Sequence, residues 1–341
     1  MIKYVGESDY KHGSEEKTGV LLTNLGTPDY PNASALKIYL KEFLSDQRVI
    51  EIPKLLWQLI LRLVILNIRP RRSAKNYKKI WTDEGSPLLV YSKKIVSAVE
   101  KNLKDEFVNT VFILGMRYGN PSLEHALKEM KKQKVRRLLV FPLYPQYCAS
   151  TTASTFDKIT NILQKWRWIP EIRFINNYFE EDLYIKAVSD SIKDKWNKLG
   201  KPQKTIFSYH GIPLSYLMKG DPYHCYCLKT TRLVKEELGL NDEDVMTTFQ
   251  SRFGSQEWLQ PYTDETLKKL PNHGIKNIHI LSPGFSVDCL ETLEEIDEEN
   301  RDYFIKAGGN SYHYINCLND SKNHINMISA IIKKHSQGWK V

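Results

Sequence analysis

A row of carboxylates in the C-terminal part of the chain is the feature best suited to chemistry. Glu291, Glu295 and Glu299 recur every four residues, and Asp288 stands one turn before them. On a helix, this spacing places the side chains along one face. Like charges in such a row destabilise a helix unless water, a metal ion or a cationic group compensates for them. The row therefore predicts a site that handles cations or protons, or else a solvated helix face.

A histidine ends an apolar segment earlier in the same part of the chain. His210 follows Thr205-Ile-Phe-Ser-Tyr209 and precedes Gly211-Ile-Pro213. A histidine at a strand end beside a glycine can reach a cleft and act near neutral pH as a proton acceptor or a nitrogen ligand. A lone histidine in such a place is more often structural. Together with the carboxylate row, it predicts a mixed His and carboxylate site for a divalent ion.

Other kinds of site lack their motifs. No Gly-x-Gly-x-x-Gly follows the first apolar strand and no P-loop motif occurs, so the phosphate cradles of dinucleotide and P-loop proteins are not predicted. Cys225 and Cys227 are too few for a structural zinc site or an iron–sulfur cluster by themselves. Ser208 and Ser286 lack the G-x-S-x-G elbow of a serine hydrolase.

Two sets of similar segments must position these residues. Residues 19–28 and 205–213 both have the pattern of a short buried strand that breaks at a glycine, with proline two residues later. Met116-Arg-Tyr-Gly119 is echoed by Ser251-Arg-Phe-Gly254. Each echo precedes a further apolar strand that ends in proline, at 137–142 and 277–283 respectively.

Amphipathic helical stretches lie between the predicted strands, at 122–132, 181–199 and 230–238. Strands alternating with helices predict an α/β fold with parallel sheets, whose functional loops lie at the C-terminal ends of the strands. The repeated segments divide the chain into two similar halves, residues 1–172 and 173–341.

Residues 53–82 form a basic and apolar stretch, called the lip below, with eight basic residues and no acid. Within it, 55–68 has the pattern of a helix that is apolar over most of its circumference and too short to span a bilayer. One interpretation is an interfacial helix that binds anionic lipid or an apolar anionic ligand, and the other is a core helix or a dimer interface. The polar stripe of this helix consists of Lys54, Gln58, Arg62 and Arg69.

Composition limits the class of protein. The chain has 341 residues, enough for about two domains, and its 41% hydrophobic and 26% charged residues exclude a disordered or multispan membrane protein. The net charge of +9 favours anionic partners, although no nucleic-acid motif accompanies it. Five cysteines form no disulfide framework, and the first eighteen residues contain no apolar signal segment. We therefore expect a cytoplasmic protein.

These features together resemble the ferrochelatases, most closely the Gram-negative bacterial type. The resemblance runs in order from about Gly19 to about Ile331. Its motifs are Leu22-Thr-Asn-Leu-Gly-Thr-Pro28, Gly115-Met-Arg-Tyr-Gly119, Phe141-Pro-Leu-Tyr-Pro-Gln-Tyr147 with Ser150-Thr-Thr152, Phe207-Ser-Tyr-His-Gly-Ile-Pro213, Lys219-Gly-Asp-Pro-Tyr223, Phe249-Gln-Ser-Arg-Phe-Gly254 with Glu257-Trp-Leu259, and Pro283-Gly-Phe-Ser-Val-Asp-Cys-Leu-Glu-Thr-Leu-Glu-Glu-Ile296.

The resemblance implies two Rossmann-like halves with a cleft between them. It implies a lyase that inserts Fe²⁺ into protoporphyrin IX, the terminal step of haem biosynthesis, with release of two protons. His210 and Glu291 match the family's catalytic and metal-contacting residues, with His210 as base, iron ligand or both. The residues that match a proton or metal relay are Asp288, Glu295 and Glu299.

Further positions match the family's porphyrin pocket, in which Arg117 and Ser150 would contact a propionate or bond near it. The matching positions are Leu25, Arg117, Tyr118, Tyr144, Ser150, Trp258 and Phe285. The lip matches the family's apolar lip at the cleft mouth, which favours peripheral contact with the cytoplasmic face of the inner membrane. An upstream porphyrin-producing enzyme is a further expected partner, and nucleic acid is not.

The resemblance implies no tightly bound cofactor, because Fe²⁺ is a substrate. Some relatives carry a [2Fe–2S] cluster on a C-terminal extension, but this sequence ends at Val341, which argues against a cluster. Cys289 stands where other relatives have histidine. The competing hypotheses are a chelatase acting on coproporphyrin III, a cobalt or nickel chelatase, a porphyrin carrier without turnover, and a basic membrane-surface or nucleic-acid module.

Overall fold

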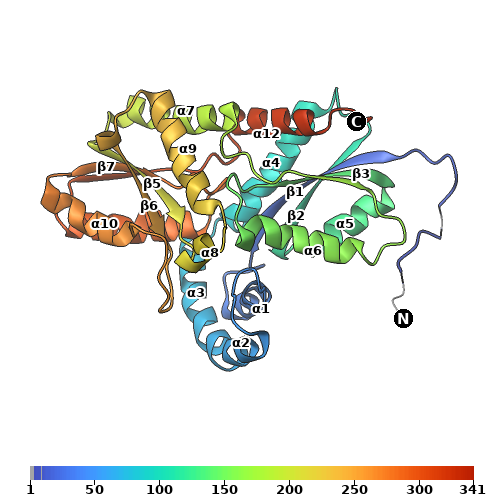
Figure 1. The fold of residues 1–341 in the computed structure, drawn as a ribbon, viewed down its shortest axis with the longest axis horizontal. Helices are drawn as coiled ribbons and strands as arrows, with labels where there is room; N and C mark the ends of the chain where they lie inside the picture. Colours follow the sequence, from blue (N-terminus) through green and yellow to red (C-terminus); the bar gives the residue numbers. More distant parts are fainter. Residues whose placement is uncertain (1–3, 9) are drawn as a thin grey trace. The chain divides into compact units, whose positions relative to one another are not determined.

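The structure is a computed structural model that describes residues 4–8 and 10–341 (Figure 1). The described chain divides into two compact units. The first comprises the chain up to residue 143 with 149–176 and 325–341, and the second comprises 144–148 and 177–324. Of the N-terminal segment in which no signal sequence was found, residues 1–3 and 9 lie outside the described residues.

The first unit is built on a parallel sheet of four strands in the order β2-β1-β3-β4. Its strands are β1 (Lys17–Thr27), β2 (Thr110–Gly119), β3 (Val135–Pro142) and β4 (Glu171–Phe174). The central strand β1 is buried along nearly its whole length, which explains why it reads as a continuous apolar run. The helices are α1 (Ala33–Leu44), α2 (Lys54–Ile60), α3 (Leu66–Ile80), α4 (Pro87–Leu103), α5 (Leu123–Lys132) and α6 (Ser154–Leu163), with π-helical turns η1 (Leu61–Ile65) and η2 (Ala149–Ala153).

The second unit repeats this arrangement. Its parallel sheet has the order β6-β5-β7-β8, so the first strand of each unit again lies between the second and the third. This correspondence confirms the prediction of an α/β fold with two similar halves. The strands are β5 (Lys204–His210), β6 (Val245–Gln250), β7 (Asn277–Leu281) and β8 (Ser311–Ile315). The helices are α7 (Asp182–Leu199), α8 (Leu214–Met218), α9 (Tyr223–Leu238), α10 (Thr263–Lys269) and α11 (Arg301–Lys306), with 3₁₀ turns η3 (Asp242–Asp244) and η4 (Leu270–His273) and the π-helix η5 (Glu291–Asn300).

The last helix, α12 (Lys322–His335), and the residues after it belong mostly to the first unit. Arg173 donates to the carbonyl of His335 at 2.7 Å, and Thr18 donates to the carbonyl of Lys340 at 2.7 Å. The sequence-based boundary after residue 172 assigned this segment to the second half. Hydrophobic periodicity locates a helix but carries no information about which sheet its apolar face packs against. The division of the chain in the structure differs from the predicted one for that reason.

The predicted helices at 122–132 and 181–199 correspond to α5 and α7 within one residue at each end. The third begins at Tyr223 rather than at residue 230. The Asp221 carboxylate accepts from the Tyr223 N–H at 3.0 Å and so satisfies a donor in the first turn. An aspartate followed by Pro222 is a sequence signal for such a helix start.

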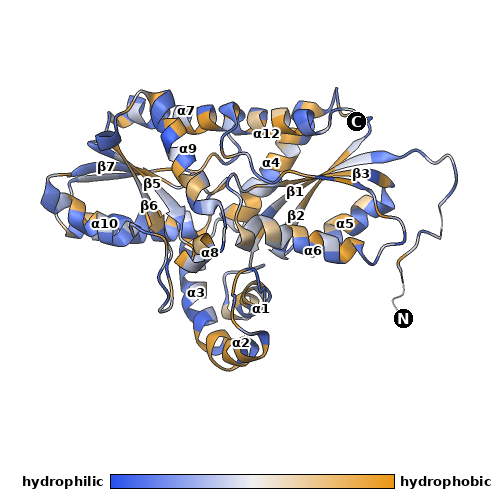
Figure 2. Ribbon diagram, viewed as in Figure 1, coloured by the Kyte–Doolittle hydropathy of each residue, from blue (hydrophilic) through white to orange (hydrophobic). Residues whose placement is uncertain are grey.

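The lip is helical but not one continuous α-helix, because η1 interrupts it between α2 and α3. Its apolar side chains are mostly exposed, and Leu55 reaches 90% exposure. Figure 2 shows α2 as a mainly hydrophobic helix at the tip of the segment formed by α1 to α3. Within the first unit these side chains are therefore not core residues. The exposed members are Leu55, Leu56, Leu59, Leu63, Val64 and Ile68.

No helix in the described part of the chain is long and apolar enough to cross a lipid bilayer.

Candidate active site

His210 is the last residue of β5, and its partly buried ring is anchored by the chain next to it. The Nδ1 atom lies 2.6 Å from the carbonyl oxygen of Gly211. A hydrogen on Nδ1 satisfies this contact, and the neutral ring then presents the lone pair of Nε2 as the acceptor or metal-binding atom. The Phe285 ring lies beside it, with 6.4 Å between the ring centroids. The backbone thus selects the tautomer that proton acceptance requires.

Gln250, at the end of the neighbouring strand β6, connects the strand of His210 to the helix of Glu291. Its backbone pairs with His210 across the sheet, and its carbonyl accepts from the Gly211 N–H at 2.8 Å. Its side-chain amide donates to the Glu291 carbonyl oxygen at 3.0 Å, while its Oε1 accepts from Ser208 at 2.8 Å. Gln250 is therefore linked to both candidate residues, to His210 through its backbone and to Glu291 through its buried side chain. Sequence reasoning missed this role, although Gln250 lies in a motif that carried the family resemblance.

The carboxylate row lies on a π-helix, whereas its spacing predicted an ordinary helix face. In η5 the backbone hydrogen bonds run from residue i to i+5, which widens the turn. The members of the row have different surroundings. The partly buried Glu295 accepts from the Ser251 hydroxyl, and the exposed Glu299 accepts from the Tyr303 hydroxyl. Glu291 is partly buried at the first turn. Only part of the row is therefore a solvated face.

The Glu295 carboxyl is the most perturbed acid of the row. Burial raises its pKa from 4.5 to about 7, and the negative charges of Glu291 and Glu299 act in the same direction. The Ser251 hydroxyl opposes this rise. Ser251 follows β6 directly and adopts a left-handed backbone with φ of 68°. This carboxyl is consequently able to hold or release a proton near neutral pH.

The raised pKa of Glu295 predicts how stability depends on pH. Because the folded carboxyl holds its proton more tightly than the unfolded one, its stabilising contribution is complete below pH 4.5. It is lost as the pH rises through about 7. Glu295→Gln removes this dependence. We therefore expect the Tm of the variant, relative to the parent chain, to increase between pH 5 and pH 8. Thermal unfolding at several pH values measures the difference, and a constant difference would contradict the prediction.

Asp288, which the resemblance places in the relay, is buried, and its carboxylate is surrounded by hydrogen-bond donors. Its Oδ1 accepts from the Tyr314 hydroxyl at 2.6 Å and from Thr292 at 3.1 Å, and its Oδ2 accepts from the Asn319 amide at 2.7 Å. Further donors to this carboxylate are the Asn316 amide and the Cys317 N–H. These contacts tie the start of η5 to β8 and the loop after it. The observed geometry accounts for Asp288 as an anchor of the carboxylate helix.

We expect Asp288→Ala to destabilise the protein by roughly 3 kcal/mol, because several buried donors lose their acceptor together. Urea unfolding measures the change. Asp320→Ala, an exposed carboxylate in the adjacent loop, is the matched control and should shift stability by less than about 0.5 kcal/mol. If Asp288→Ala instead unfolds like the parent chain and loses only the activity that the resemblance implies, the relay role is favoured over the anchor.

In the first unit, the residues matched to the porphyrin pocket differ in exposure. Leu25, near the end of β1, and Ser150, in η2, are partly exposed. Tyr118 is fully buried, and the Arg117 side chain is 11% exposed and paired with Asp46. The close approach of β1 and β2 requires the neighbouring Gly26, because it has φ of 108° and a Cβ there would lie 1.7 Å from the Tyr118 carbonyl oxygen.

In the second unit, the matched aromatic residues also lie at strand ends and loops. Tyr144 and Phe285 are partly exposed, whereas Trp258 is buried. The Trp258 indole N–H donates to the Phe253 carbonyl at 3.0 Å, and the two rings pack 4.9 Å apart. Trp258 therefore offers at most a small part of its ring to a ligand in this conformation.

No three His, Cys, Asp or Glu side chains gather closely enough to hold a metal ion among residues 4–8 and 10–341. The five cysteines, all described, are free thiols. Burial raises the pKa of the Cys289 thiol well above its ordinary value, so this side chain beside Glu291 is protonated near neutral pH.

Comparisons with solved structures show the fold. The chain is similar to SirB from Bacillus subtilis, solved with Fe³⁺, with a TM-score of 0.57 and 13% identity over 94% of this chain and 96% of that one. It is also similar to CbiX, described as the terminal enzyme for biosynthesis of sirohaem in denitrifying bacteria. The TM-score is 0.51 at 11% identity, over 93% of this chain and 98% of that one.

Comparisons of sequence extend along the whole chain. The profile of the ferrochelatase family matches residues 17–336. The ferrochelatase of Idiomarina loihiensis is 54% identical over 100% of this chain and 94% of that protein. The ferrochelatase of Marinobacter nauticus is 53% identical over 100% of this chain and 92% of that protein. The chain therefore belongs to the ferrochelatase family.

Proposed function

We propose that this chain inserts ferrous iron into protoporphyrin IX to form protohaem, with release of two protons. Family membership supports metal insertion into a porphyrin. The observation that carries the mechanism is the His210 ring, whose Nδ1 contact with Gly211 leaves Nε2 as an acceptor. Glu291 supports the same function, because Gln250 ties its helix to the strand of His210.

The reaction needs two chemical contributions from the protein. Each pyrrole N–H must lose its proton, and neutral imidazole at His210 is a suitable acceptor near neutral pH. Fe²⁺ must exchange water for pyrrole nitrogens, and a carboxylate such as Glu291 favours the partly dehydrated cation. Both N–H protons leave as iron enters, and no oxidation state changes. The reaction therefore requires no resident cofactor, and iron is a substrate.

The remaining residues have proposed supporting roles. Glu295 and Glu299 continue from Glu291 along η5, and the raised pKa of Glu295 suits a group that passes protons onward. Asp288 holds this helix in place. The porphyrin ring is large and apolar, so we assign its contacts to the apolar and hydroxyl side chains that matched the family. These are Leu25, Tyr144, Ser150, Trp258 and Phe285.

Anaerobic turnover with Fe²⁺ tests the function. Protoporphyrin IX and coproporphyrin III are compared as substrates, with the porphyrin-to-haem change followed in the visible spectrum. We expect catalytic haem formation with higher kcat/KM for protoporphyrin IX. A higher kcat/KM for coproporphyrin III would make that porphyrin the substrate instead of protoporphyrin IX. Insertion of Co²⁺ or Ni²⁺ but not of Fe²⁺ would make the protein a cobalt or nickel chelatase. Tight porphyrin binding without insertion of any metal would favour the hypothesis of a porphyrin carrier over that of an enzyme.

We also propose that the lip contacts the surface of an anionic membrane, which would place the protein at the cytoplasmic face of the inner membrane. Exposed leucines of the lip and its excess of basic residues together fit apolar insertion beside anionic headgroups. This surface also suits the collection of an apolar porphyrin from the bilayer or from an upstream porphyrin-producing enzyme.

Replacing Leu55, Leu59 and Leu63 together with Ser should weaken binding to phosphatidylglycerol vesicles by at least about tenfold. Each leucine that leaves water for the bilayer contributes roughly 1.5–3 kcal/mol to the binding free energy. Vesicle co-sedimentation measures this change. Val108→Ser is the control, because Val108 is an exposed apolar side chain outside the lip. Equal vesicle binding by both variants would rule out the lip as the contact.

A further inference from the structure

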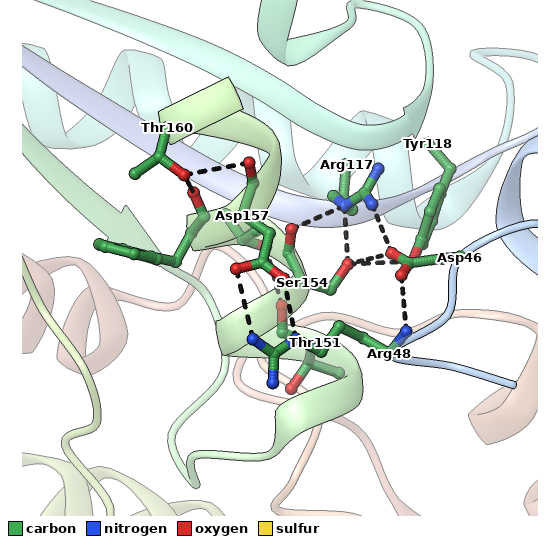
Figure 3. Close-up of polar contacts among 10 residues, drawn as sticks. Asp46, Arg48, Arg117, Tyr118, Thr151, Ser154, Asp157 and Thr160 are labelled. Atoms are coloured by element: carbon green, nitrogen blue, oxygen red, sulfur yellow. Dashed lines mark hydrogen bonds and ion pairs between the residues drawn. The ribbon is translucent and has the colours of Figure 1, made fainter. Parts of the chain in front are cut away.

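The Asp46 carboxylate, in the segment after α1, collects donors from three parts of the first unit (Figure 3). It accepts from the Arg117 guanidinium and from the Tyr118 hydroxyl at 2.8 Å, both at the end of β2. It accepts from the Ser154 hydroxyl at 2.5 Å, at the start of α6, and from the Arg48 N–H at 2.8 Å. One carboxylate thus joins the α1 segment, β2 and α6.

The Arg117 charge is compensated within the protein. The side chains of Arg117 and Asp46 are 11% and 9% exposed, so their ion pair is little screened by water. The Arg117 Nε donates to Ser154, to its hydroxyl at 2.7 Å and to its carbonyl at 3.0 Å. The guanidinium is therefore oriented by protein acceptors on two of its nitrogens. A propionate approaching Arg117 would have to compete with Asp46.

The protonation states support this arrangement. Burial raises the pKa of Asp46, but hydrogen bonds from Ser154 and Arg48 and the charge of Arg117 outweigh it and lower the pKa below its ordinary value. Burial raises the pKa of Tyr118. At neutral pH Asp46 is therefore an anion and the Tyr118 hydroxyl a donor, so the observed contacts persist through the range in which the enzyme would work.

Asp46 also follows directly on the residues that hold the lip. The Trp57 indole N–H donates to the Leu44 carbonyl at 2.6 Å, and the Gln58 amide donates to the Ser45 hydroxyl at 3.2 Å. The middle of α2 is thereby attached to the two residues that precede Asp46. A displacement of Asp46 is consequently passed both to α2 and to the end of β2.

We propose that Asp46 is a positioning residue for porphyrin binding and that Arg117 acts with it as a positioning pair, not as the receptor for a propionate. The pair orients the end of β2 and the base of the lip. This inference rests on the proposed function, because it concerns the porphyrin as substrate. It predicts that loss of the pair weakens binding of a porphyrin with free carboxylates and of one with esterified carboxylates to the same extent.

The experiment uses Asp46→Asn, Arg117→Gln and the double variant, with protoporphyrin IX and its dimethyl ester. Asp46→Asn alone leaves a buried cation unpaired, so its Tm should fall, whereas the double variant should regain most of the loss. The porphyrin KM should stay raised by about tenfold or more in all three variants, for the diacid and the ester alike. The KM for Fe²⁺ should not change. Asp157→Asn, which removes the charge of an exposed carboxylate paired with Arg48, is the control and should behave as the parent chain.

Two results would overturn the inference. If Arg117→Gln weakens binding of the diacid but leaves the ester unaffected, Arg117 is a carboxylate receptor. If the double variant recovers its porphyrin KM together with its Tm, Asp46 only stabilises the fold. Porphyrin dissociation constants from fluorescence quenching are measured beside the kinetics. If the parent chain inserts no iron, the proposed function fails, while the binding constants still decide the role of Asp46.

Discussion

Glu291→Gln should lower the rate of iron insertion by on the order of a thousandfold while the protein still binds porphyrin. The amide keeps the size of the side chain but loses the negative charge that favours a partly dehydrated cation. The fold should persist, because the bond that ties this residue to Gln250 uses the backbone carbonyl of Glu291 and not its side chain. Anaerobic kinetics with Fe²⁺ and porphyrin fluorescence quenching measure the two effects separately.

Glu298→Gln is the matched control for this variant. It makes the same chemical change in the same helix, at an exposed position outside the predicted row. We expect its rate to remain within about twofold of the parent chain. A carrier has no use for the charge of Glu291, so unchanged metal insertion in Glu291→Gln would contradict the proposed mechanism.

His210→Ala should also lower iron insertion, by roughly a hundredfold to ten-thousandfold, the range that a positioned proton acceptor contributes. The alanine removes Nε2 and leaves the pyrrole protons to bulk water. Added imidazole should restore part of the rate if proton acceptance is the missing step. Steady-state rates with and without imidazole, at saturating porphyrin, measure both effects.

His273→Ala is the control for general loss of a histidine, because His273 lies exposed in η4. Its rate should match that of the parent chain. A folded His210→Ala variant that keeps full activity would remove His210 from the mechanism, and circular dichroism at the assay temperature establishes that the variant is folded.

Much of the fold was predictable because buried parallel strands have a strong signature. The segments that became β1, β3, β5 and β7 are apolar runs that end near glycine or proline. The echo between Met116–Gly119 and Ser251–Gly254 falls at the end of β2 and directly after β6, strands that occupy corresponding places in the two sheets. Hydrophobic periodicity also located α5 and α7, since each turns an apolar face to a sheet.

The carboxylate helix η5 has properties that its sequence pattern does not predict. Acids spaced by four residues are compatible with an α-helix face, and the spacing does not reveal that the backbone bonds run from i to i+5 in η5. The surroundings that separate Glu295 from Glu299 come from Ser251, 44 residues before Glu295 in the chain, and from Tyr303. Protonation behaviour within the row is thus a property of tertiary neighbours.

The sequence by itself determined the α/β class, the two similar halves and the candidacy of His210 and of the carboxylate row, because each follows from the order of residues within short segments. The family resemblance singled out Glu291 within that row. Only the tertiary structure decided that Asp46 pairs with Arg117, 71 residues away, and that Asp288 anchors η5. It also decided which apolar side chains of the lip remain exposed. Burial and the pairing of charges depend on contacts between segments distant in the chain, and residue order within one segment does not encode them.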